Sequence, residues 1–198
     1  MLLGEIVLAT VRPRQRLPAL AARGEAAATA TVVASGLVSS GLQLAAGALE
    51  PRGRLAAPAA GVAISLLLVP LLLGFWLASA LLIDVAARVM GVASDRGAIR
   101  RLTAFAFPVL VVYAAVTLGQ ACLDRAGGTA ASLSLALGLL NLVVLFWFIA
   151  VTAVAARTAY ELPAPHAALA ALFPYAALSG LLFAFVVIAS ILHALGVL

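Results

Sequence analysis

Five stretches of this chain are long and apolar enough to cross a lipid bilayer, and they constrain the fold more than any other feature. The expected spans are residues 26–49, 59–83, 99–121, 130–156 and 167–195, and four of them contain no Asp, Glu, Lys or Arg. A spanning helix needs about 20 apolar residues, and only helices or closed barrels satisfy their backbone polar groups inside lipid. Because the runs have helix length, the sequence predicts an all-α, polytopic membrane protein, a bundle of five transmembrane helices.

The composition places nearly the whole chain in this membrane class. Of its 198 residues, 66% are hydrophobic and only 10% are charged, whereas a soluble domain carries about 25% charged residues. No soluble domain is therefore expected. Residues 1–25 are expected to form an N-terminal interfacial and basic segment, and residues 26–198 the transmembrane domain.

The N-terminal segment has two parts. Leu, Ile and Val side chains recur on one side of Met1–Val11, which is too short to span and suits a helix lying in the interface. Pro13 and Pro18 are expected to interrupt the helix after it. The Arg residues between these prolines and just before them are expected to lie among lipid headgroups.

The first span differs from the others in being rich in Ala, Ser, Thr and Gly. Small residues recur four apart, as in Ser35/Ser39 and Gly36/Ser40, and this spacing lets two helix backbones approach closely. We therefore expect this helix to lie inside the bundle. Prolines within the second, third and fifth spans predict kinks at Pro70, Pro108 and Pro174.

The distribution of Arg predicts the orientation. All twelve basic residues are Arg, and the net charge is +5. Three of them, Arg52, Arg54 and Arg125, fall on one side of the predicted membrane. The other nine, Arg12, Arg14, Arg16, Arg23, Arg88, Arg96, Arg100, Arg101 and Arg157, fall on the other side. Cytoplasmic loops collect basic residues, so the N-terminus is expected in the cytoplasm and the C-terminus outside the cell membrane. Because the Arg residues are spread over several loops, nucleic acid is not an expected partner.

The junction between the second and third spans is the candidate site. Asp84 and Arg88 are four residues apart and can pair on one helix face. We expect a headgroup-level ion pair; the alternative is an acid on an ion or proton path. Gly91 is expected to end the helix. The candidate partner or lipid contacts are Asp84, Arg88, Arg96, Arg100 and Arg101. Tyr160 and Tyr175 are expected in an aromatic belt at the membrane surface.

Little in the sequence points to catalysis. Ser179 and His193 would lie about 21 Å apart on one helix, too far for a nucleophile and its base. His166 and His193 are predicted on opposite sides of the membrane, so a shared metal site is not expected. No cofactor and no enzymatic activity are expected either. The deepest amide, Asn141, is expected to make an interhelical hydrogen bond, with a substrate contact as the alternative.

Three segments, VRPRQRLPAL, DVAARVMGVASDRGAIRRLTAFAFP and AARTAYELPAPHAALAALFPY, carry a family resemblance. The chain resembles the Yip1 family of multi-pass membrane proteins in its short bacterial form. The matching positions are Arg88, Gly91, Ser94, Arg100, Arg101, Ala104, Ala106 and Pro108. Val92 and Phe105 depart from the pattern, and the Asp-Leu-Tyr-Gly-Pro motif of eukaryotic members is missing.

The resemblance implies a membrane scaffold with five spans. The small-GTPase and vesicle-traffic role of eukaryotic members is not expected here, because their motif is missing and the Lys-free composition indicates a GC-rich bacterial genome. We therefore predict a non-enzymatic scaffold or accessory subunit. It would act through membrane lipids, another membrane protein or a second copy at its Arg-rich junction. The alternative is a permease subunit or small-solute channel lined by proline-kinked helices.

Overall fold

The computed structural model describes residues 10–22, 24–49, 58–126 and 131–194. The expected helix Met1–Val11 therefore lies almost wholly outside the described residues. The helices are α2 (Pro13–Ala21), α3 (Glu25–Leu49), α4 (Pro58–Val89), α5 (Arg96–Ala104), α6 (Pro108–Arg125), α7 (Ala131–Tyr160) and α8 (Ala164–Ala194). Five segments within them are long and apolar enough to cross a membrane. The predicted all-α, polytopic fold is confirmed.

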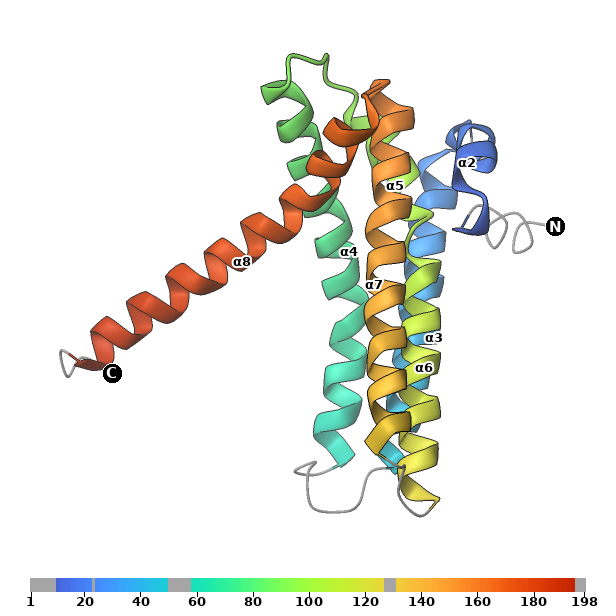
Figure 1. The fold of residues 1–198 in the computed structure, drawn as a ribbon, viewed down its shortest axis with the longest axis vertical. Helices are drawn as coiled ribbons and strands as arrows, with labels where there is room; N and C mark the ends of the chain where they lie inside the picture. Colours follow the sequence, from blue (N-terminus) through green and yellow to red (C-terminus); the bar gives the residue numbers. More distant parts are fainter. Residues whose placement is uncertain (1–9, 23, 50–57, 127–130, 195–198) are drawn as a thin grey trace.

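The long helices α3, α4, α6 and α7 run side by side with alternating direction, and α2 and α5 lie at one end of the bundle (Figure 1). α3 packs against α4 and α6, while α7 packs against α5, α6 and α8. The end of the bundle that holds α2, α5, the last turns of α4 and α7, and the start of α3 is called the Arg-rich end below. Its described Arg residues are Arg12, Arg14, Arg16, Arg88, Arg96, Arg100, Arg101 and Arg157.

The buried face of α3 consists of small residues and Val32, while Leu37, Val38 and Leu44 are exposed. Ser35, Gly36, Ser39 and Ser40 are buried against neighbouring helices, whereas Leu37 is 60% exposed. A Cβ atom added at Gly36 would lie 3.3 Å from a methyl carbon of Val69 on α4. The close approach of these two helices therefore depends on the absence of a side chain at this position, as the small-residue spacing predicted.

The third span is a short helix, a turn and a longer helix. α5 ends at Ala104, and the amides of Phe105, Ala106 and Phe107 bond to carbonyls three residues back. Pro108 then begins α6, because proline has no amide hydrogen and its ring clashes with the carbonyl four residues earlier. The expected kink at Pro108 is thus a complete break between two helices. By contrast, α4 and α8 continue through Pro70 and Pro174.

The segment from α5 into this turn is the most deeply buried part of the described chain. Ile99 packs with Ile83 and Tyr160, while Phe107 packs with Trp76 and Phe148. A third group of buried side chains joins α5 and its turn to α2 and α7 through Leu17, Leu20, Leu102, Phe105 and Ala155. Three apolar clusters therefore meet at this one segment and fix α5 against the bundle.

α2 corrects the expectation that two prolines interrupt the N-terminal segment. Pro13 occupies the first helical position, where an amide hydrogen would have no partner, and the helix continues through Pro18 to Ala21. Leu17 and Leu20 are buried on α5 and α7. This burial supports a helix that contains an internal proline, so α2 is packed on the bundle end with its Arg side chains outward.

α8 contacts the bundle only through its first turns. Ala167, Ala170 and Ala171 are fully or almost fully buried, whereas Leu181 is 69% exposed and Phe183 is 71% exposed. Beyond Pro174 the helix leaves the other helices at a wide angle (Figure 1). The connection between the expected spans 130–156 and 167–195 is shorter than predicted, because α7 continues to Tyr160 and α8 begins at Ala164.

The approach of α3 to α4 gives a test of the packing. We expect Gly36→Leu to destabilise the protein by about 1–3 kcal/mol, because the new side chain must displace Val69. Gly41→Leu on the same helix is the matched control, since a Cβ there has nothing within 4 Å; a neutral change or a stabilisation of up to about 1 kcal/mol is expected, because leucine favours the helix more than glycine does. Thermal unfolding in detergent measures both, and equal losses would contradict this packing.

Candidate functional site

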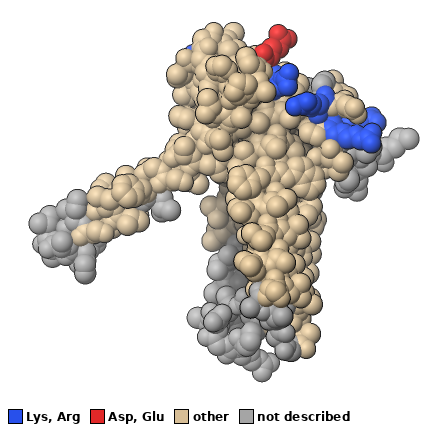
Figure 2. All heavy atoms as spheres, in the orientation of Figure 1, with Lys and Arg blue, Asp and Glu red and all other residues tan. Residues whose placement is uncertain are grey.

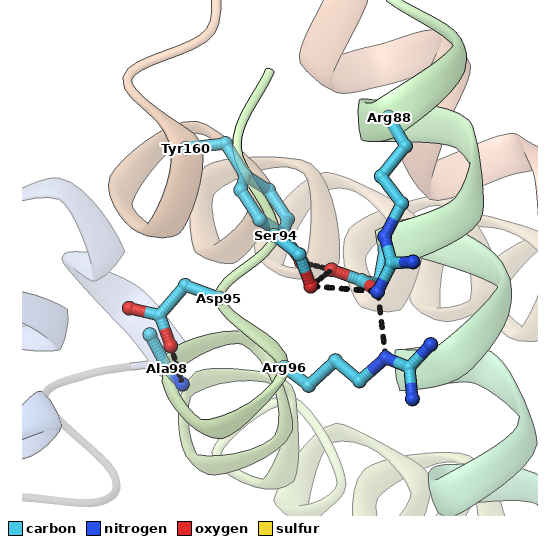
Figure 3. Close-up of polar contacts among 7 residues, drawn as sticks. Arg88, Ser94, Asp95, Arg96, Ala98 and Tyr160 are labelled. Carbon is cyan, nitrogen blue, oxygen red and sulfur yellow. Dashed lines mark hydrogen bonds and ion pairs between the residues drawn. The ribbon is translucent and has the colours of Figure 1, made fainter. Parts of the chain in front are cut away.

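The carboxylate of Asp84 is completely buried and is the centre of a hydrogen-bond network (Figure 3). Its Oδ2 atom accepts from Arg88 Nη2 at 2.7 Å and from Arg96 Nε at 2.9 Å. Its Oδ1 atom accepts from the Tyr160 hydroxyl and from Ser94 Oγ, both at 2.9 Å. One side chain thus joins the end of α4, the loop after it, the start of α5 and the end of α7.

Local sequence brings the chain back to Asp84. The Gly91 amide bonds to the Arg88 carbonyl and the Val92 amide to the Ala87 carbonyl, the paired bonds of a helix-ending Schellman motif. Gly91 has φ of +82°, a left-handed conformation that other residues adopt only at a cost. Gly91 therefore ends α4, as predicted, and reverses the chain so that Ser94 can reach the carboxylate.

The start of α5 is fixed by a capping carboxylate. The Asp95 side chain accepts a hydrogen bond of 2.9 Å from the Ala98 amide, and so satisfies one of the free amides of the first helical turn. Asp95 therefore sets where α5 begins, and Arg96 is its first residue. From there the Arg96 side chain reaches Asp84 on α4.

The positive and negative charges of the network do not cancel. A buried carboxylate is costly unless it is paired and hydrogen-bonded, and Asp84 receives donors on both oxygens. Ser94 Oγ donates to Asp84 and accepts from Arg88 Nη2 at 2.7 Å, which links the acid to its partner a second time. Two Arg and one Asp leave a net charge of +1. The Arg88 and Arg96 side chains are 44% and 60% exposed, so this surplus charge faces outward.

The structure brings together some of the predicted residues and not others. The expected Asp84–Arg88 pair is confirmed, and the Asp84 carboxylate is buried because Arg96, Ser94 and Tyr160 also enclose it. Arg100 does not join this cluster and instead pairs with Glu25 at the start of α3.

Arg101 and Asn141 also lie apart from the network. The Arg101 Nε atom is buried and has no hydrogen-bond partner among the described residues. Asn141 Oδ1 is likewise buried without a hydrogen-bond partner among the described residues, so this oxygen does not make the interhelical bond expected of the Asn141 amide.

Of the two tyrosines expected in an aromatic belt, Tyr160 is buried inside the protein and Tyr175 is half-buried. Tyr160 is 6% exposed and bonds to Asp84, and the Tyr175 ring packs 6.0 Å from that of Phe75. Nothing in the sequence indicated that Tyr160 bonds to Asp84, since a Tyr at the end of an apolar run is typical of an aromatic belt. Ser94 was weakly indicated in the sequence, because a hydroxyl shortly after a helix-ending Gly can reach back to that helix.

A small cavity lies among α4, α5, α7 and α8, below the network. Its volume is about 10 Å³, the space that one water molecule needs. Most of its lining is apolar, including Phe75, Phe107 and Phe148, and the Ser79 hydroxyl in its wall has no partner among the described residues. The cavity is large enough for a water molecule and too small for a solute.

Comparison of the chain with protein-family profiles, curated proteins and solved structures found no match. Within the part of the chain that the structure describes, no group of three or more His, Cys, Asp or Glu side chains could hold a metal ion. The network around Asp84 and the outward-facing Arg side chains are therefore the features from which a function can be argued.

Replacing the buried acid tests the network. We expect Asp84→Asn to destabilise the protein by about 2–4 kcal/mol and Tyr160→Phe by about 1–2 kcal/mol, because each change leaves former partners unpaired. The double variant should lose less than the sum of the two, since both changes remove the same bond. Asp95→Asn is the control: Asn also caps helices, so little change is expected. Strict additivity in detergent unfolding would contradict the Tyr160–Asp84 bond.

The turn after α4 gives a second test. Gly91→Ala should cost about 1–2 kcal/mol, because alanine is strained at this positive φ. Gly74→Ala within α4, where an added Cβ meets nothing within 4 Å, should be neutral or stabilising. If thermal unfolding shows the two variants to be equally stable, Gly91 does not hold the conformation described here.

Proposed function

We propose that this chain is a non-enzymatic integral membrane protein that serves as a scaffold or accessory subunit, as its resemblance to the Yip1 family implies. Its Arg-rich end would bind an acidic juxtamembrane segment of another membrane protein. The observation that carries this proposal is the one-sided charge: eight described Arg and four described acidic residues lie at that end, a net charge of +4. Arg side chains stand out from this end in Figure 2.

Several of these Arg side chains are free to meet a partner. Arg12, Arg14 and Arg16 are exposed on α2, whose apolar face is packed on the bundle, and Arg157 is exposed near the end of α7. The side chains of Arg12, Arg14 and Arg16 are therefore held by a helix that is packed on the bundle, and we call their surface the basic ridge. The positive-inside rule would place this ridge in the cytoplasm of a bacterial cell, with the C-terminus across the cell membrane.

The interior supports a scaffold better than a permease or channel. Both oxygens of the one described acid buried near a spanning-helix end accept hydrogen bonds, so Asp84 has little capacity left for an ion or proton. The cavity below it has a volume of only about 10 Å³ and mostly apolar walls. Transport sites are instead expected to keep polar or charged groups facing a water-filled path.

Crosslinking in native membranes tests the scaffold role. A photo-reactive residue at position 14, on the exposed face of α2, should attach to one dominant protein partner. The matched position 125, at the opposite end of the bundle, should not capture that partner. Arg12→Glu with Arg16→Glu should reduce the adduct at position 14, because the charge attraction is reversed. Adducts with lipid and with the chain itself alone would contradict the proposal.

A further inference from the structure

From the geometry around Asp84 we infer that Arg88 and Arg96 form a built site for the phosphate of an anionic phospholipid. The inference deepens the proposed function by assigning part of the Arg-rich end a lipid ligand, and it rests on that function only for the placement of this end at a membrane surface.

The two guanidinium groups are held close together by one oxygen atom. Arg88 Nη2 and Arg96 Nε both bond to Asp84 Oδ2, at 2.7 Å and 2.9 Å, so they cannot lie farther apart than the sum of these distances. Two like charges at such a separation repel, and a single buried carboxylate neutralises only one of them. The arrangement therefore favours a second anion on the outer side.

The outer sides of the two guanidinium groups carry free hydrogen-bond donors. Arg88 Nη1 and both Nη atoms of Arg96 make no hydrogen bond to any residue within the described ranges, because Arg88 uses Nη2 and Arg96 uses Nε on the network. Figure 3 shows the outer ends of both guanidinium groups on the side away from Tyr160 and Asp95. Parallel guanidinium N–H groups match the oxygens of a phosphate and bind it through charge-assisted hydrogen bonds.

No competing acid blocks this edge among the described residues near it. Both oxygens of Asp84 already accept hydrogen bonds. Asp95 points to the other side, where it caps α5 (Figure 3). The site is also preorganised, since Asp84 and Ser94 already hold Arg88 in place. A ligand would therefore not have to order that side chain itself.

The position of the site favours a lipid as the source of the phosphate. Arg88 is in the last turn of α4, at the end of a segment apolar enough to span the bilayer, where lipid phosphates are expected. Val85 and Val89, on the same stretch of α4, are 37% and 83% exposed. A phosphate bound here would place its acyl chains along the apolar surface of α4, which a soluble phosphate compound would not use.

The test measures lipid binding to the purified full chain by native mass spectrometry, with phosphatidylglycerol against phosphatidylcholine. The wild type should bind one phosphatidylglycerol at least tenfold more tightly than phosphatidylcholine. Arg96→Gln should lower the affinity for phosphatidylglycerol about tenfold, the effect of losing a charge-assisted contact. This variant keeps the Arg88–Asp84 pair and so preserves the fold; unfolding curves check that. Arg96→Lys should restore only part of the affinity, because it keeps the charge without the planar fork.

Arg157→Gln is the matched control, an exposed Arg at the same end without an acid partner in the network. Equal losses in Arg157→Gln and Arg96→Gln would show diffuse charge attraction and overturn the site. Displacement of the lipid by millimolar inorganic phosphate would assign the site to soluble phosphate compounds and overturn the lipid source. The protein crosslink at position 14 does not depend on this lipid, so the two proposals can fail separately.

Discussion

A buried carboxylate that water cannot reach needs hydrogen-bond donors from the protein. Meeting this requirement at Asp84 brings together the segments at one end of the molecule. The acid is at the end of α4, and its donors come from a loop, from α5 and from α7. α4 and α7 do not pack directly against each other over any substantial length, since α5 and α8 lie between them. The Tyr160–Asp84 bond therefore adds a direct polar link between two helices that share apolar clusters mainly through α5 and α8.

The deeply buried α5 and its turn make this polar centre possible. Pro108 forces the third span to restart, and the aromatic residues before it fill the space between the helices. Trp76 on α4 donates a 2.8 Å hydrogen bond to the Arg100 carbonyl, so α5 is fixed to α4 by its backbone as well. With α5 fixed, Arg96 reaches the buried acid, and Arg100, one helical turn later, pairs with Glu25.

The parts of this structure that depend on spacing along one helix could be predicted from the sequence. Runs of apolar residues located the spans, the four-residue spacing found the Asp84–Arg88 pair, and Gly91 marked the end of α4. What the sequence did not indicate depends on contacts between distant segments. Tyr160 reaches Asp84 across 76 positions, and whether a Tyr at a helix end faces headgroups or a buried acid depends on which helix is its neighbour.

The divergence of α8 gives the molecule an uneven cross-section. Near the Arg-rich end α8 is packed on α4 and α7, while its far half stands apart with its apolar side chains uncovered. In a bilayer, lipid must enter the space between that half and the bundle, so the protein takes up more lateral area in the leaflet away from the Arg-rich end. A wedge of this kind fits best where the membrane bends, with the wider leaflet on the convex side.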